Sequence, residues 1–156
     1  VPVAGLNAKL FSLECVCVMH KDDPLSTRDV IHPDDLANRS IISITGQHTV
    51  DRQLDGYLTA AGVAVERHIS SYFFAIARNI IAVGNEIAII DPTNGKAKLN
   101  DGVTWRSFDP RINHEMAIIT PSDQPLGQAA GGLYDLITQS LQKLANTPNA
   151  VCTDAK

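Results

Sequence analysis

The sequence predicts an α/β protein, and three observations support that fold class. Short apolar segments typical of strands alternate with amphipathic segments of helical period along most of the chain. In residues 70–92 a Ser-Ser start opens an apolar helical segment that Gly84 ends. A buried, isoleucine-rich strand follows at once and ends at Asp91-Pro92. This alternation predicts parallel pairing for most of the sheet.

The first part of the chain contains two strands and the start of a helix. Residues 13–19 are an apolar run of valines and cysteines typical of a strand, and residues 20–24 are a charged loop with a proline. A helix begins in residues 32–37, with a proline at its first position and acids in its first turn. Residues 41–44 form the second strand, and residues 45–48 turn the chain.

The middle of the chain repeats this alternation. Thr49 caps an amphipathic helix that Gly62 ends. Residues 63–69 alternate as a half-exposed strand, residues 70–83 form the apolar helix and residues 86–90 the strand after it.

The last third predicts a short helix over residues 93–100 and strands over residues 103–108 and 115–120. Residues 126–144 carry the apolar spacing of a long helix. The opening strand has no earlier helix or strand to pair with. We therefore expect a complete domain of this kind to begin upstream of this chain.

Composition and charge exclude several classes of protein. With 156 residues the chain is one domain or parts of two, and its net charge of −4 offers no basic footprint for nucleic acid. The longest apolar stretch is interrupted at Gly84-Asn85-Glu86, which excludes a transmembrane helix. The first residues lack the basic start and apolar core of a signal peptide. Because the first residue is not Met, we expect a piece of a longer product.

Three cysteines give no disulfide framework, and we expect Cys15 and Cys17 to be buried, reduced thiols in a cytosolic protein. A metal bound by Cys15, Cys17 and His20 would need a fourth ligand, which the sequence does not offer at a recognisable spacing. The five histidines are scattered, and no nucleophile, base and orienting residue stand together. We therefore expect no enzyme, no metal and no cofactor.

Five short motifs occur in the order and spacing of one family. The segment Cys15-Val16-Cys17-Val18-Met19-His20-Lys21-Asp22-Asp23-Pro24-Leu25 resembles the "V-C-V-x-x-x-x-H/D-P-L" signature of the effector-binding domain of LysR-type transcriptional regulators. The other four are Asp34-Asp35-Leu36-Ala37, Ile42-Ser43-Ile44, Ala60-Ala61-Gly62-Val63, and Ile81-Ala82-Val83-Gly84 with Ile87-Ala88-Ile89-Ile90-Asp91-Pro92. The resemblance extends from about Leu6 to Leu144.

The resemblance implies a type-2 periplasmic-binding-protein-like fold, in which two α/β subdomains joined by crossover strands hold an inducer in their cleft. Residues 21–109 would be subdomain II, and residues 1–20 and 110–145 the closing half of an incomplete subdomain I. Residues 146–156 would be a loose tail. The winged helix-turn-helix that binds DNA would lie outside this chain. The resemblance also implies a cytoplasmic homo-oligomer, a dimer or a tetramer, that binds no membrane.

By resemblance, the inducer lies between the loop after residues 41–44 and the start of the helix over residues 70–83. Hydroxyl and amide groups on a close-approaching turn, and N–H groups at a helix start, would bind a carboxylate. The candidate ligand-binding residues are Thr45, Gly46, Gln47, His48, Ser70, Ser71, Tyr72, Phe73 and Asp91.

Each candidate has a structural alternative. Ser70 and Ser71 would serve equally as helix caps, and Tyr72 and Phe73 as core side chains. Asp91 follows a strand, where it would accept a ligand amine or cap the next turn.

The expected ligand is a small anionic or zwitterionic metabolite. Residues 108–112 and 116–121 resemble family members that sense amino acids or opines. Two alternatives come from other classes: an extracytoplasmic solute-binding protein of a transporter, and an enzyme on a related cleft fold.

Overall fold

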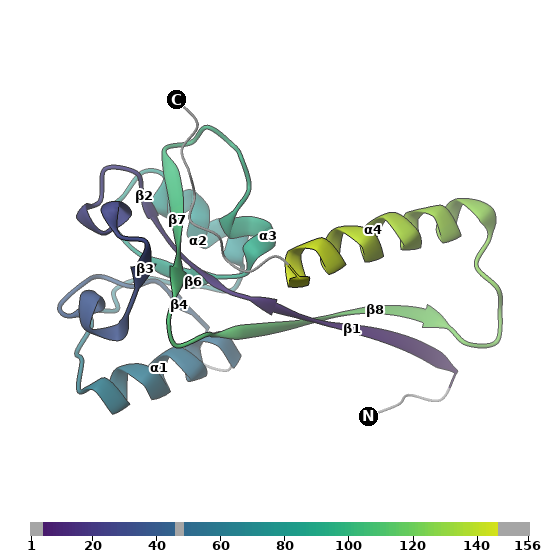
Figure 1. The fold of residues 1–156 in the computed structure, drawn as a ribbon, viewed down its shortest axis with the longest axis horizontal. Helices are drawn as coiled ribbons and strands as arrows, with labels where there is room; N and C mark the ends of the chain where they lie inside the picture. The colour runs from purple at the N-terminus through teal and green to yellow at the C-terminus, as the bar shows by residue number, and fades with distance from the viewer. Residues whose placement is uncertain (1–4, 46–48, 147–156) are drawn as a thin grey trace. The chain divides into compact units, whose positions relative to one another are not determined.

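The structure contains the alternating helices and strands that the sequence predicts. The computed structural model describes residues 5–45 and 49–146 (Figure 1). Their backbone contacts divide them into a smaller unit of residues 5–13 and 115–146 and a larger unit of residues 14–45 and 49–114. The subdomain boundaries expected from the family resemblance stay a prediction. Among these described residues, no helix has the length and apolar character needed to cross a membrane.

Strand β2 (Val16–His20) lies inside the four-stranded sheet of the larger unit. It pairs antiparallel with β6 (Ala88–Ile90) on one side and with β7 (Val103–Phe108) on the other, and β3 (Val30–Ile31) pairs parallel with β7. The predicted parallel pairing is therefore wrong for β2. The chain enters the larger unit through β2 and leaves it through β7. These two neighbouring strands therefore run in opposite directions.

Parallel pairing does occur around β4 (Ser43–Ile44), which pairs with β5 (Ser70–Ser71). Directly before β4, Ile41 pairs parallel with Ile87, and the Ile42 N–H donates to the Ile87 carbonyl at 2.9 Å. Because Ile87 leads into β6, the strands β4, β5 and β6 run in the same direction. Their carboxyl ends therefore lie at one edge.

A helix follows each of these three strands: α1 (Thr49–Ala61), α2 (Phe74–Ile81) and α3 (Pro92–Gly95). Two 3-10 helices, η1 (Pro24–Thr27) and η2 (Pro33–Leu36), lie earlier in the chain. The predicted end of α1 is confirmed, because the next residue, Gly62, has a φ of +67°. This left-handed conformation ends helices and favours glycine.

Three local predictions are wrong in the larger unit. The helix predicted over residues 93–100 starts at Pro92 and ends at Gly95. Residues 63–69 form no strand beyond a single bridge between Glu66 and Ser40. The helix predicted from Ser70 begins only at Phe74, because pairing with β4 holds Ser70 and Ser71 in an extended strand. Pairing with a distant segment here overrides a local helical pattern.

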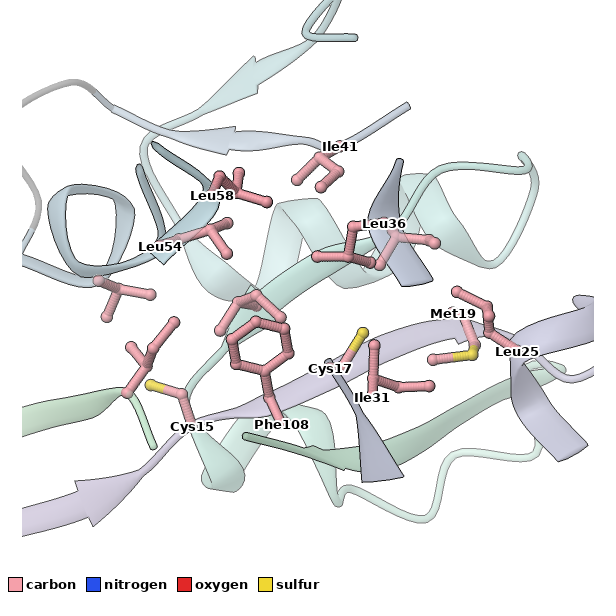
Figure 2. Packing of buried hydrophobic residues seen from close by; sticks show 14 residues of the cluster. Cys15, Cys17, Met19, Leu25, Ile31, Leu36, Ile41, Leu54, Leu58 and Phe108 are labelled. Carbon is pink, nitrogen blue, oxygen red and sulfur yellow. The ribbon is translucent and has the colours of Figure 1, made fainter. Parts of the chain in front are cut away.

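The side chains of strand β2 alternate between two buried layers. Cys17 and Met19, with Cys15 just before the strand, belong to the cluster that contains Leu54 and Leu58 of α1 (Figure 2). Cys15 and Cys17 are buried and form no disulfide, so the predicted burial of these two thiols is confirmed. Both faces of β2 are therefore buried, as the continuous apolar run in its sequence indicates.

The opposite face of β2 packs beneath α2 and α3. Val16 and Val18 cluster there with Ala77 and Ile81 of α2. Gly95, the last residue of α3, lies so close to the strand that an added Cβ would be 2.3 Å from Val16 Cγ2. Glycine therefore permits the close contact between α3 and the sheet.

The smaller unit contains most of strands β1 (Leu6–Glu14) and β8 (Asn113–Pro121) and the long helix α4 (Gln128–Asn146). The two strands pair and run in opposite directions (Figure 1). The strand predicted over residues 13–19 is in fact two strands, separated at Cys15. The buried core of this unit consists of Phe11, Leu13 and Leu141.

Candidate functional site

Three strand-to-helix corners lie at the edge where β4, β5 and β6 end. The predicted site residues occur at all three: Thr45 follows β4, Tyr72 follows β5 and Asp91 follows β6. The register pairs Ile44 with Ser71, so Thr45 and Tyr72 leave the sheet as neighbours. Ligands of α/β proteins commonly bind at the carboxyl ends of parallel strands. The candidates Gly46, Gln47 and His48 lie outside the described residues.

Thr45 has a backbone conformation that is unusual for its residue type. Its φ is +34°, and a β-branched residue rarely adopts a positive φ. Strain of this kind persists only where the surrounding structure fixes the backbone, and it clusters at functional sites. The end of β4 is therefore a place where an unfavourable local conformation is retained.

The second corner leaves α2 without a polar cap, although we expected a serine there. Phe73 occupies the N-cap position, and its side chain makes no hydrogen bond to the helix. Ser71 Oγ instead accepts from the Phe73 N–H at 3.2 Å and donates to the Phe73 carbonyl at 2.9 Å. Ser71 is buried, whereas Ser70 is exposed. The start of α2 thus keeps its partial positive charge without a side-chain oxygen of its own at the N-cap.

Tyr72 and Phe73 project from this corner into solvent. Their exposed fractions are 81% and 64%, so the core-packing alternative is wrong for both. The sequence pattern pointed to the core because aromatic residues beside an apolar helix are usually buried. Here they form an exposed apolar surface next to the helix start.

Asp91 is positioned differently from the other candidates. It is only 1% exposed, and its carboxylate accepts from the N–H groups of Thr93 and Asn94 at 2.9 and 3.2 Å. The Thr93 hydroxyl and the Asn94 side-chain amide also donate to it. These contacts match the capping alternative, and this carboxylate has almost no surface on which to meet a ligand.

Sequence reasoning missed a contact between α1 and the segment that leads out of the larger unit. The Gln53 side chain donates to the Asn113 carbonyl at 2.9 Å and accepts from the Asn113 N–H at 3.2 Å. One turn later, the Tyr57 hydroxyl donates to the Arg111 carbonyl at 3.1 Å. The available signal was the i, i+4 spacing of two polar side chains on an amphipathic helix.

Two other side chains near this edge were missed as well. The ring of His114 lies edge-on to that of Phe74 at the start of α2, with 5.2 Å between the ring centroids. Arg67 lies beside α1, 3.3 Å from the Asp51 carboxylate and 2.6 Å from that of Asp55. Because these two carboxylates balance the charge of Arg67, the guanidinium organises α1 rather than supplying a counter-charge for a ligand.

The thiols have no chemical role that the structure supports. Burial raises the pKa of Cys15 and Cys17 far above the ordinary thiol value, so both stay protonated. A neutral, buried thiol is neither a good nucleophile nor a metal ligand. In the part of the chain that the structure describes, no group of three or more His, Cys, Asp or Glu is arranged to hold a metal.

Comparison with protein families identifies the family of this chain. The family model described as "LysR substrate binding domain" matches residues 5–142. The chain belongs to the LysR substrate-binding domain family. The periplasmic-binding-protein-like α/β fold implied by the sequence motifs is confirmed by this match and by solved LysR regulatory domains.

Three relatives of this LysR-family chain illustrate the similarity. The chain is 28% identical to the regulatory protein NocR of Agrobacterium tumefaciens (strain T37) over 114 residues, which are 73% of this chain and 38% of NocR. The structure of HinK, a LysR family transcriptional regulator from Pseudomonas aeruginosa, matches with a TM-score of 0.62 and 14% identity, over 92% of this chain and 51% of HinK. The regulatory domain of Synechocystis PCC6803 CcmR, solved in complex with 2-PG, matches with a TM-score of 0.63 and 16% identity, over 95% of this chain and 72% of that one.

The relatives narrow the functional class of this LysR-family chain. They are transcriptional regulators, and they indicate no catalytic family. The solute-binding alternative is not favoured by these matches. The chain spans well under half the length of NocR.

Proposed function

We propose that this chain is the effector-sensing part of a LysR-type bacterial transcriptional regulator. It binds a small anionic or zwitterionic metabolite at the edge where β4 and β5 end. Binding changes how the longer protein contacts DNA through a winged helix-turn-helix outside this chain. The observation that carries the proposed site is the parallel pairing of β4 with β5, which makes Thr45 and Tyr72 neighbours.

The start of α2 favours a carboxylate as part of the ligand. The N–H groups of a first helical turn carry partial positive charge, and their interaction with an anion is worth about 0.3–1 kcal/mol at a surface. Phe73 provides no side-chain oxygen that would compete for this position. Ser70 is exposed beside it, and the hydroxyl groups of Ser70 and Thr45 are suitable donors.

The neighbouring side chains extend the proposed site. Tyr72 and Phe73 offer exposed aromatic surface for the apolar part of a ligand. Gly46, Gln47 and His48 stay in the proposal on the strength of the family resemblance. Amino acids and opines combine a carboxylate with an amine and a side chain, so they suit such a mixture of contacts.

Helix α1 offers a route from the ligand to the rest of the protein. It begins directly after the loop that Thr45 opens, and its Gln53 and Tyr57 bind residues 111–113 of the outgoing segment. A displacement of α1 on ligand binding would therefore be passed to that segment. In a cytoplasmic dimer or tetramer, the change would alter the spacing of the DNA-binding domains.

Thermal unfolding in the presence of candidate metabolites tests the proposal. We would measure the Tm of the chain with L-lysine, L-glutamate and an N-(1-carboxyethyl) amino acid, which is an opine. A ligand that binds only the folded chain raises stability by about 2.7 kcal/mol at one hundred times its Kd. We expect one of these compounds, or a close analogue, to raise the Tm in a saturable manner.

Matched variants locate the binding. The substitutions Thr45→Val and Ser70→Ala should each weaken the Tm response, by about five- to tenfold in apparent Kd for one lost hydrogen bond. The exposed Thr59→Val on α1 is the control and should leave the response unchanged. If Thr45→Val and Ser70→Ala bind as the unmodified chain does, the proposed site is wrong.

A further inference from the structure

A concave surface lies away from the proposed effector site. It is a groove of about 850 Å³ along strand β7, lined by Lys21, Ser26 and Thr27 and by residues 95–106. Strand β2 ends, and β7 begins, at one end of this groove. Since β2 runs antiparallel to β6, this end lies at the sheet edge opposite to that of Thr45.

The charge of this groove is opposite to that of the chain. Lys21, Lys96, Lys98 and Arg106 line it, whereas Asp101 is its single acidic lining residue. The Asp101 carboxylate is already paired with the Arg78 guanidinium at 3.0 Å. A chain with a net charge of −4 thus presents a concave surface of strongly positive character.

The wall formed by residues 95–101 is anchored in the core. Arg78 of α2 is only 2% exposed and donates to the Gly95 carbonyl at 3.1 Å, the Ala97 carbonyl at 3.0 Å and the Asp101 carboxylate at 3.0 Å. The lysines of this wall are therefore carried by a fixed backbone. A fixed backbone reduces the conformational entropy that is lost when Lys96 and Lys98 are ordered around an anion.

Lys96 and Trp105, which both line the groove, contact each other. The Lys96 ammonium lies 4.6 Å from the centroid of the Trp105 ring, in the geometry of a cation–π contact. Partial burial lowers the pKa of Lys96, because the charged form loses part of its hydration. The Glu14 carboxylate acts in the opposite direction and raises this pKa, so Lys96 is a cation with a favourable electrostatic contact within the chain.

We propose that this groove binds a small, multiply charged anion, either a phosphate ester or a polycarboxylate. The site is separate from the effector site at the opposite sheet edge, and the inference does not depend on the proposed function.

The single tryptophan of the chain makes this proposal directly testable. Trp105 fluorescence of the 156-residue chain would be followed during titration with sodium pyrophosphate, and in a second arm with sodium citrate, at constant ionic strength. Isothermal titration calorimetry on the same samples would record binding that leaves the fluorescence unchanged. We expect saturable binding of at least one anion, and the better of the two arms identifies the class of ligand.

Variants that remove positively charged side chains test whether the lysines of the groove bind the anion. The double variant Lys21→Met/Lys98→Met changes two exposed side chains, and it should weaken binding by about tenfold or more, the effect of 1.4 kcal/mol. The exposed Lys143→Met on α4 should leave the affinity unchanged. The proposal is overturned if neither anion binds at millimolar concentration, if sodium chloride reproduces the response, or if the double variant binds as well as the unmodified chain.

Discussion

Replacement of Arg78 by methionine removes the anchor that joins α2 to residues 95–101. The Arg78 guanidinium donates three hydrogen bonds and lies almost entirely out of solvent. Methionine fills a similar length of buried space without a charge. The variant Arg78→Met therefore tests the hydrogen bonds and the ion pair with little change in packing.

The expected loss of stability follows from what two of the three acceptors, the Gly95 carbonyl and the Asp101 carboxylate, can do afterwards. The Gly95 carbonyl is buried and would be left unpaired, at a cost of about 1–3 kcal/mol. The Asp101 side chain is partly exposed and also accepts from the Val103 N–H, so water can replace the guanidinium there. Part of the loss is offset because the variant no longer buries a charge. We therefore expect a net destabilisation of about 2 kcal/mol.

Thermal and fluorescence measurements would test this expectation. For a chain of this size about 2 kcal/mol corresponds to a fall in Tm of about 4–8 °C. Acrylamide should quench Trp105 more strongly in the variant, because the wall over the ring is released. The exposed Arg52→Met on α1 is the control and should change neither quantity. An unchanged Tm and unchanged quenching for Arg78→Met would refute the reasoning.

Two further predictions concern the core. The variant Gly95→Ala should lower stability by about 1–3 kcal/mol, because the added Cβ meets Val16 Cγ2 at 2.3 Å, and a urea midpoint equal to that of the unmodified chain would contradict the close packing. In a Cys152→Ser background, Cys15 and Cys17 should react with a thiol-specific disulfide reagent only at the rate of unfolding, since burial raises the pKa of both thiols. Rapid labelling under native conditions would show that the thiols are accessible.

The helices and strands that could be predicted are those whose start, end or periodic pattern lies within the element's own residues. Helix α1 carries its own start and end signals, in Thr49 and Gly62, and β7 matches the predicted residues 103–108. Strand β3 has two residues, too few for any periodic pattern. The extended state of Ser70 and Ser71 depends on β4, more than twenty residues away in the sequence, so no local reading would find it.

The candidate site shows the same limit. The order of the family motifs indicated which loops belong to the candidate site. Whether a side chain in those loops can contact a ligand depends on its exposure, which the motifs do not give. Asp91 and Tyr72 both follow a strand, yet the first is buried as a cap and the second is exposed. The groove lined by Lys21 and Lys98 was not predicted at all, because these residues are far apart in the sequence and β7 brings them together.

The most direct test of the proposed effector site is a map of backbone amide chemical shifts in isotope-labelled chain, recorded during titration with the metabolite that raises the Tm most. The account predicts that the largest changes occur at Thr45, at Ser70–Phe73 and in the first turn of α2, with smaller changes at Gln53 and Asn113. Shifts confined to other surfaces would contradict the assignment of the effector site to the edge where β4 and β5 end.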